Sequence, residues 1–352
     1  MNYHIERGGS EAAYWQLYRQ LRQDILEGVY PVGGKLPSKR QLAAELGLSV
    51  ITVEHALALL VDEGCAQPRE RSGLYVSFGG AAPRPKAGLE EMRLSADVPE
   101  DFPFSMLGRI MRRVLADYGE RILLRSPNAG CAELRTALAD YLLRSRGLRV
   151  QPQQIVVGSG AEYLYGLVVQ LLGRERLYAH EEPCYDKIRR VYAAFGAQTV
   201  GLPMGDDGIE RAALDGCTAR VLHVTPYHSY PSGVTASTAR RHEYALWARR
   251  CDAVIVEDDY DSELSVPARQ VETIYSIAPE RVIYLNTFSK TMAPGMRMGY
   301  IVLPEPWMAR YEEALGFYSC SVPVYEQLVL AEFIRSGELE RTINRRRRRG
   351  RV

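Results

Sequence analysis

The chain has 352 residues, 46% of them hydrophobic, and its formal net charge is +1. A chain of this length is expected to fold as about two domains with buried cores, and a net charge so near zero excludes a global field that attracts nucleic acid or a membrane surface. Because no apolar run is long enough for a membrane span or a signal core, the sequence predicts a cytoplasmic protein without a membrane partner.

The cysteines predict neither a metal site nor disulfides. They are scattered along the chain without a CxxC pair and without a matching histidine spacing. Reduced thiols are expected at all six positions, which are Cys65, Cys131, Cys184, Cys217, Cys251 and Cys320.

The first 77 residues predict a small helical domain that ends in a hairpin. Apolar residues at spacings of three and four predict an amphipathic helix over residues 11–27. Ser38 followed by Gln41 predicts a capping box at the start of a second helix, and Gly47 can supply its left-handed end. Ser49 then caps a third helix. Two short helices joined by a Gly-containing turn predict a helix-turn-helix, whose second helix can enter the major groove of DNA.

A wing follows this motif, because residues 65–77, CAQPRERSGLYVS, read as two short strands around a turn. Any small helical domain can show a short turn between helices, and this plain alternative stays open. Caps, turn and wing together resemble the winged helix-turn-helix of the GntR family of bacterial regulators, whose pattern runs LPSERELA and then GVSRxTV. The resemblance implies contacts to double-stranded operator DNA from Lys35, Ser38, Arg40, Ser49, Thr52, Arg69 and Arg71.

Two departures from that pattern concern DNA affinity. Val50 stands where the family has an arginine, and Glu54 stands where some members carry another arginine that faces DNA. Residues 1–77 hold eight Lys plus Arg against nine Asp plus Glu, so attraction to phosphates has to come from local clustering. Weak or effector-dependent DNA binding is therefore expected.

Beyond this domain, residues 78–103 are rich in Pro, Gly, Ala and charge, which predicts a linker. In residues 104–352, short β-rich runs alternate with amphipathic segments such as RRHEYALWARR. The alternation predicts an α/β domain with a mainly parallel sheet covered on both faces by helices. The expected strands are QQIVV, RLYA, QTVGLP, ARVLHV, AVIVED, RVIYLN and RMGYIVL. Ligands of such sheets collect at the carboxyl ends of the strands.

Three of these strand ends carry groups that suit pyridoxal phosphate. Gly158 and Gly160 open what reads as a helix, whose N-terminus could hold a phosphate. The carboxylates of EDDYDSEL follow AVIV, and the stretch TFSKTMAPGMRMGY supplies Lys290 and Arg297. A lysine binds the aldehyde of the cofactor, a carboxylate keeps its pyridine nitrogen protonated, and hydroxyls with an arginine neutralise its phosphate.

The large domain resembles fold-type I aminotransferases, and its combination with the first domain resembles the MocR subfamily of GntR regulators. EDDYDSEL, TPYHSYPSG and NTFSKTMAPGMRMGY match that subfamily's EDDYDSEF, TPSHQFPTG and GTFSKTLFPALRLGY over most of their lengths. The resemblance implies that Lys290 is the Schiff-base lysine, that Asp258 partners the pyridinium nitrogen and that Tyr260 contacts the ring oxygen. It implies a cofactor site formed by Gly160, Ala161, Glu162, Tyr185, His228, Asp258, Tyr260, Thr287, Ser289, Lys290 and Arg297, with Tyr185 stacked on the ring.

Each assignment has a plain alternative. Lys290 could be an ordinary surface lysine, Asp258 could cap a helix or face solvent, and Tyr185 could be core packing. His228 reads more readily as structural than as catalytic, and Arg297 could be an ion-pair partner.

Near Asn344 the resemblance ends. MocR proteins continue from the corresponding helix into a small C-terminal subdomain that carries the arginine for the substrate carboxylate, and this sequence stops at Val352 without it. The run from Arg345 to Arg349 could be a solvated tail, a basic patch for nucleic acid, or the product of a frameshift or an incomplete chain. We expect a truncation.

Together these features predict a transcriptional regulator that binds pyridoxal phosphate and DNA as a homodimer. A small amino compound is expected to act as effector by displacing Lys290 from the aldehyde, which would bias the arrangement of the domains. An active aminotransferase with a vestigial DNA-binding domain is the alternative. Val50 and Glu54 favour it, whereas the missing subdomain and Tyr230, which stands where aminotransferases carry asparagine, oppose it. A truncated product that folds poorly is the third possibility.

Overall fold

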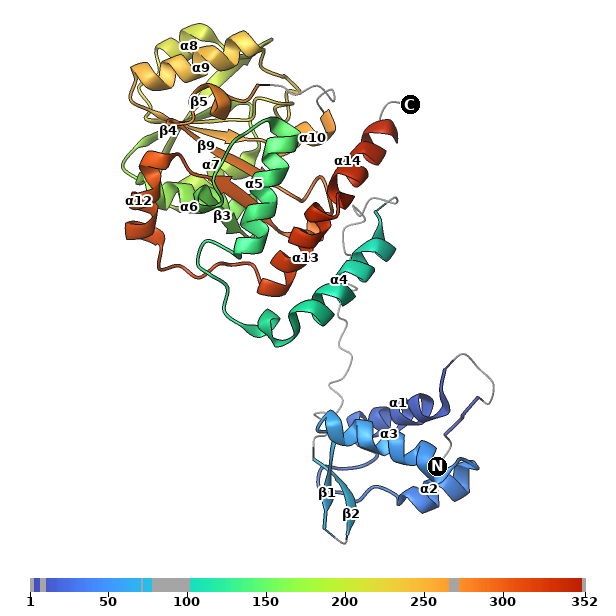
Figure 1. The fold of residues 1–352 in the computed structure, drawn as a ribbon. Coiled ribbons are helices and arrows are strands. Elements are labelled where there is room, and N and C mark those ends of the chain that lie inside the picture. Colours follow the sequence, from blue (N-terminus) through green and yellow to red (C-terminus); the bar gives the residue numbers. More distant parts are fainter. Residues whose placement is uncertain (1–2, 7–10, 71, 78–101, 266–271, 350–352) are drawn as a thin grey trace. The chain divides into compact units, whose positions relative to one another are not determined.

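The computed structural model describes residues 3–6, 11–70, 72–77, 102–265 and 272–349, in two compact units that span Met1–Leu94 and Ser95–Val352 (Figure 1). The predicted linker lies outside the described residues except for its last two. Within the described ranges, no helix has the length and apolar character that crossing a membrane requires.

The first unit is the predicted winged helix-turn-helix. Its elements are α1 (Ala13–Leu26), α2 (Lys39–Leu46), α3 (Val50–Asp62), β1 (Ala66–Arg69) and β2 (Gly73–Val76). The two strands pair in an antiparallel hairpin, which is the wing. Side chains from the three helices form one core, whose fully buried members include Leu17, Leu21, Ile25, Leu42, Val53 and Leu60.

Side-chain caps fix the starts of α2 and α3. Ser38 Oγ accepts a hydrogen bond from the Gln41 amide at 3.2 Å, and Ser49 Oγ accepts one from the Thr52 amide at 3.0 Å, so both predicted N-caps are confirmed. The second half of the predicted capping box is wrong. Gln41 Nε2 donates to Glu45 Oε1 at 3.0 Å, because this acceptor lies one turn ahead on the same helix face.

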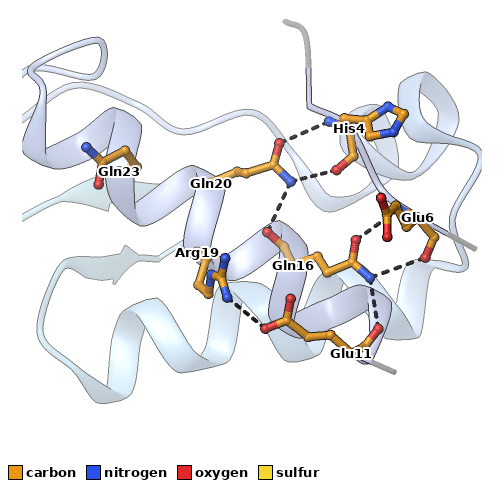
Figure 2. Close-up of a pocket in the computed structure, with 7 residues that line it drawn as sticks. All are labelled: His4, Glu6, Glu11, Gln16, Arg19, Gln20 and Gln23. Atoms are coloured by element: carbon orange, nitrogen blue, oxygen red, sulfur yellow. Dashed lines mark hydrogen bonds and ion pairs between the residues drawn. The ribbon is translucent and has the colours of Figure 1, made fainter. Parts of the chain in front are cut away.

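An extended arm, residues 3–6, lies along α1 and is held by two glutamine side chains (Figure 2). Gln20 exchanges two hydrogen bonds with the backbone of His4, at 2.8 and 3.0 Å, and Gln16 does the same with Glu6, at 3.2 and 2.9 Å. Because Gln16 and Gln20 are one helical turn apart, their amides bond to the extended backbone as a neighbouring strand would. The arm and helix line a surface pocket of about 550 Å³.

The second unit is built on an eight-stranded sheet with the order β3-β10-β9-β8-β7-β4-β5-β6. The strands β4, β5, β7, β8 and β9 pair in parallel, whereas β10 is antiparallel to β3 and β9, and β6 is antiparallel to β5. The mainly parallel sheet is thus confirmed. The strands are β3 (Ile155–Gly158), β4 (Leu177–Glu182), β5 (Gln198–Gly205), β6 (Gly208–Ile209), β7 (Val221–Val224), β8 (Val254–Asp258), β9 (Val282–Thr287) and β10 (Gly299–Val302).

Helices cover both faces of this sheet (Figure 1). One buried cluster packs against α4 (Phe104–Tyr118), α5 (Ala132–Arg146), α8 (Arg211–Asp215), α9 (Thr238–Arg250), α11 (Ile274–Ile277), α13 (Val324–Arg335) and α14 (Glu338–Arg349). The cluster on the other face packs against α6 (Ala161–Leu172), α7 (Asp186–Ala194) and α12 (Glu305–Leu315). A short helix, α10 (Ser262–Ser265), follows β8. Because successive strand residues point to opposite faces, each central strand contributes to both clusters.

The strand register brings the predicted site residues to one edge of the sheet. Gly299, at the start of β10, pairs with both Gly158 and Thr287, which end β3 and β9. On the next strand, Asp258 pairs with Leu285. The carboxyl ends of β3, β8 and β9 therefore lie together.

Candidate functional site

The loop after β9 presents Lys290 at this edge. Its neighbours Phe288, Thr291 and Met292 are buried, and Phe288 donates a backbone hydrogen bond to the Met298 carbonyl at 2.9 Å. Lys290 itself is exposed, and no ion pair of its ammonium group is seen among the described residues. Buried residues on both sides thus fix the loop while the primary amine stays accessible.

Asp258, at the end of β8, is a buried carboxylate with one oxygen held and the other unsatisfied. It is 2% exposed, so the alternative that it faces solvent is wrong. Oδ2 accepts a hydrogen bond from the Tyr165 hydroxyl and lies 3.5 Å from Nε2 of His223, whose Nδ1 lies 2.6 Å from the Tyr192 hydroxyl. Oδ1 has no hydrogen-bond partner among the described residues. A buried acceptor without a donor is costly, so this oxygen suits a donor that a ligand supplies, such as a protonated ring nitrogen.

A turn suited to an anion lies at the start of α6. Gly160 has a φ of 98°, and the first hydrogen bond of the helix runs from Leu164 to its carbonyl at 3.2 Å. The amides of Ala161 and Glu162 come before this first bond, so they donate no hydrogen bond within the helix and can bind a phosphate oxygen. A Cβ at Gly160 would lie 3.0 Å from the Arg297 guanidinium, so glycine permits both the positive φ and this close approach.

Glu162 lies between two cations at this turn. Its carboxylate accepts hydrogen bonds from Lys187 Nζ and from Arg297 Nη2, the latter at 2.5 Å. The hydrogen bond from Lys187 does most to lower the pKa of Glu162, partial burial acts in the opposite direction, and Arg297 lowers it further. The ion pair named as the alternative for Arg297 is therefore present. Thr287 is buried and Ser289 is half-buried.

Aromatic residues from three loops surround the same sheet edge. Tyr185 is 38% exposed and meets Tyr230 edge to face, with ring centroids 6.3 Å apart, so the alternative that Tyr185 is core packing is wrong. The Tyr260 hydroxyl donates to the His228 carbonyl at 2.8 Å, and burial raises the pKa of Tyr260. His228 has a φ of 65°, and its ring Nδ1 lies 3.1 Å from Asp261. This contact agrees with a structural role for His228.

A buried polar cluster anchors the segment that follows Asp258, and the partners of its carboxylates could not be predicted from the sequence. Asp259 is fully buried and accepts hydrogen bonds from Arg146 and from the Tyr284 hydroxyl, the latter at 2.6 Å. Glu263 accepts one from Asn286 at 2.7 Å. Burial, and then repulsion by Asp259, raises the pKa of Glu263 to about 7.

Helix α14 also reaches this edge. Arg346 donates a hydrogen bond to the Lys290 carbonyl, and Arg347 Nε donates to the Glu263 carbonyl at 2.5 Å. A solvated tail therefore does not describe these two arginines. They connect the last described helix to the lysine loop and to α10.

In the first unit, the residues predicted to contact DNA lie at the surface of the helix-turn-helix and the wing. Thr52 is half-buried, whereas the other described members are exposed, and Arg71 lies outside the described residues. The Ser49 and Thr52 hydroxyls also lie 2.7 Å from each other. The exposed set comprises Lys35, Ser38, Arg40, Ser49 and Arg69.

Comparison with known proteins matches both units. The model for bacterial regulatory proteins of the gntR family matches residues 13–76, and the model for aminotransferase class I and II matches residues 94–349. The chain is 31% identical to the uncharacterized HTH-type transcriptional regulator YdeL of Bacillus subtilis, over 95% of this chain and 76% of that protein. It is 32% identical to the HTH-type pyridoxine biosynthesis transcriptional regulator PdxR of Corynebacterium glutamicum, over 95% of this chain and 75% of that protein.

Two solved aminotransferase structures resemble the second unit. An archaeal alanine:glyoxylate aminotransferase superposes with a TM-score of 0.64 at 25% identity, over 70% of this chain and 63% of that one. LysN, an α-aminoadipate aminotransferase from Thermus thermophilus complexed with N-(5'-phosphopyridoxyl)-L-leucine, superposes with a TM-score of 0.62 at 26% identity, over 72% of this chain and 65% of that one. The chain thus spans less than two thirds of the length of these two structures.

Proposed function

This chain belongs to the HTH-type transcriptional regulators that join a gntR-family domain to an aminotransferase class I and II domain, and from this premise we propose how it acts. The winged domain binds operator DNA. The aminotransferase-like domain senses pyridoxal 5′-phosphate, alone or together with a small amino compound. The protein acts as a cytoplasmic homodimer, so paired half-sites are expected in the operator.

Pyridoxal 5′-phosphate is the cofactor of the aminotransferase class I and II fold, and the residues at the sheet edge fit it. When bound, it supplies an aldehyde that reacts with primary amines and a ring nitrogen that withdraws electrons once protonated. Lys290 offers the primary amine. Asp258 offers the unsatisfied Oδ1 as acceptor for the ring N–H, and this oxygen is the observation that carries the proposal. Gly160 and Arg297 offer backbone amides and a guanidinium for the phosphate.

The residues around Lys290 favour sensing over turnover. Tyr230 occupies the position of the aminotransferase asparagine and is exposed. Arg346 of α14 donates a hydrogen bond to the Lys290 carbonyl, so a shift of the backbone at Lys290 would change a contact of that helix. An amino compound that competes with the Lys290 amine is therefore the input of the conformational response in this proposal.

DNA binding in the presence and absence of the cofactor tests this function. Labelled duplexes selected by the full chain from a random pool are titrated with the wild type and with Lys290→Ala, each with and without pyridoxal phosphate and a panel of amino acids. The proposal expects the dissociation constant of the wild type to change with the small molecules, and that of Lys290→Ala to stay constant. An equal response of both proteins contradicts it. Sustained transfer of an amino group to a keto acid by the wild type, with loss of this activity in Lys290→Ala, would instead favour an active aminotransferase.

A further inference from the structure

The solvent face of α3 begins with exposed aliphatic side chains. Val50 is 41% exposed and Ile51 is 67% exposed, although both are β-branched hydrophobic residues in the first turn behind the Ser49 cap. The opposite face of the helix fills the core with Val53, Ala56, Leu57 and Leu60. Ile51 therefore adds nothing to the core, and Val50 adds little.

Glu54 lies one turn further along the same face. Its carboxylate accepts a hydrogen bond from Lys39 Nζ at 2.8 Å, and both side chains are about half exposed. Lys39 opens α2, so this ion pair joins the two helices of the motif. The pair fixes the Glu54 side chain and compensates its charge, which reduces the repulsion that a lone carboxylate would exert on DNA phosphates.

The groups around this face suit a nucleic acid more than a second protein. Lys35, Arg40 and Arg69 are exposed on the neighbouring elements, and Arg69 lies over the Tyr75 ring of the wing at 4.3 Å. The N-terminal residues of the second helix of a helix-turn-helix are the ones that contact base edges. Val50 and Ile51 occupy these positions, directly after the cap.

The side chains on α3 restrict which bases they can recognise. The helix sequence, VITVEHALALLVD, contains no Arg, Lys, Asn or Gln, which are the bidentate readers of guanine and adenine. The apolar group on the major-groove edge is the C5-methyl of thymine. Both cytosine N4 and adenine N6 are amino donors there, but a carboxylate, which only accepts, suits cytosine better because adenine places the N7 acceptor beside its N6 donor. Two aliphatic side chains and, one turn later, a glutamate therefore suit a site that presents thymine methyl groups and a cytosine amino group.

We propose that α3 reads thymine methyl groups with Val50 and Ile51 and a neighbouring cytosine amino group with Glu54, which Lys39 positions. The half-site therefore presents thymine and cytosine to this helix, and guanine contacts come from elsewhere in the domain. This inference rests on the proposed DNA binding and deepens it, because it names the base chemistry of the operator.

The test starts with a duplex that the full chain selects from a random pool. Each thymine in turn is replaced by deoxyuridine, which removes the methyl group and leaves pairing intact, and dissociation constants are measured at fixed salt. For the wild type, loss of one recognised methyl weakens binding roughly fourfold, the effect of exposing about one methylene-sized group. Ile51→Ala is expected to bind both duplexes equally at that position. Because this side chain is exposed, the variant should fold, and Val32→Ala, exposed to 64% outside the helix, is the matched control.

Selection with Glu54→Gln tests the second contact. Glutamine pairs with adenine, so the preference at the position read by Glu54 is expected to move from cytosine to adenine. Equal affinity of the wild type for thymine and deoxyuridine at every position would overturn the inference while leaving DNA binding intact. So would discrimination that persists undiminished at every position in Ile51→Ala. Failure of the folded wild type to select any duplex would overturn DNA binding as well.

Discussion

Replacing Glu162 by glutamine should tighten binding of the cofactor. Glu162 accepts hydrogen bonds from Lys187 and Arg297, and both cations lie at the turn where the phosphate is expected. A bound phosphate must share these cations with the carboxylate or displace it, and it also meets the negative charge of the carboxylate. Glutamine has nearly the same shape and carries no charge, so it removes this competition.

The expected magnitude follows from the exposure of the pair. The side chain of Glu162 is 33% exposed and each cation is 53% exposed, so both interactions are closer to surface ion pairs than to buried ones. Such pairs contribute roughly 0–1 kcal/mol each. Their loss should favour the phosphate by about 1 kcal/mol, which is roughly a fivefold lower dissociation constant.

Two assays check this value. Spectrophotometric titration gives the dissociation constant of pyridoxal phosphate, and thermal unfolding in rising concentrations of inorganic phosphate reports on the anion site without the aldehyde. Glu175→Gln is the matched control, because Glu175 is an exposed glutamate that pairs with Arg174 at 3.2 Å. Unchanged binding in Glu162→Gln would refute the reasoning. Weaker binding in this variant alone would refute it as well and would mean that Glu162 helps to hold the cofactor.

Substitutions at three further positions test one helix cap and the buried carboxylates. Ser49→Ala should lower the free energy of unfolding of the first domain by about 1 kcal/mol in urea denaturation, and Ser49→Asn, which can still cap, should not; equal losses would count against the cap. Tyr165→Phe removes the donor to Asp258 Oδ2 and should cost about 1.5–3 kcal/mol in unfolding free energy, with weaker retention of pyridoxal phosphate; no change in either would exclude this hydrogen bond. Burial raises the pKa of Glu263 from 4.5 to about 7. Between these two pH values the folded state keeps a proton that the unfolded state releases. The free energy of unfolding should therefore fall as the pH rises from about 4.5 to about 7. Glu263→Gln should remove up to about 3 kcal/mol of this decline between pH 4 and 8, and parallel curves of unfolding free energy against pH would contradict the assignment.

Local signals in the sequence predicted much of the fold. Ser38 and Ser49 have short side chains that accept hydrogen bonds, and each stands directly before a segment with the apolar spacing of a helix. Gly47, with a φ of 62°, ends α2 in the left-handed conformation. The alternation of β-rich and amphipathic runs predicted a mainly parallel sheet. Lys290 and Asp258 could be singled out because each follows a strand, and parallel strands end at one edge.

The partners of these groups could not be predicted, because they depend on strand order. His223 lies near Asp258 since β7 neighbours β8 in the sheet. Every residue of β7 is buried, so the sequence pattern cannot tell which face His223 occupies. Arg146 and Asp259 are 113 residues apart, and only the packing of α5 brings them together.

Helix α14 shows the same limit for charged runs. A run of five arginines does not show from its sequence whether it forms a solvated tail, a basic patch or a docked helix. Arg346 and Arg347 donate to the backbone carbonyls of Lys290 and Glu263, which identifies a docked helix. These acceptors lie far away in the sequence, so the run itself could not predict them.

The most direct test of cofactor sensing is the absorbance spectrum of the full chain mixed with pyridoxal phosphate. Lys290→Ala is measured beside the wild type, with Lys187→Ala as a matched lysine variant at a saturating concentration of cofactor. We predict the band of covalently bound cofactor in the wild type and in Lys187→Ala, and its loss in Lys290→Ala. An identical band in Lys290→Ala, or no band in the wild type, would contradict the central claim.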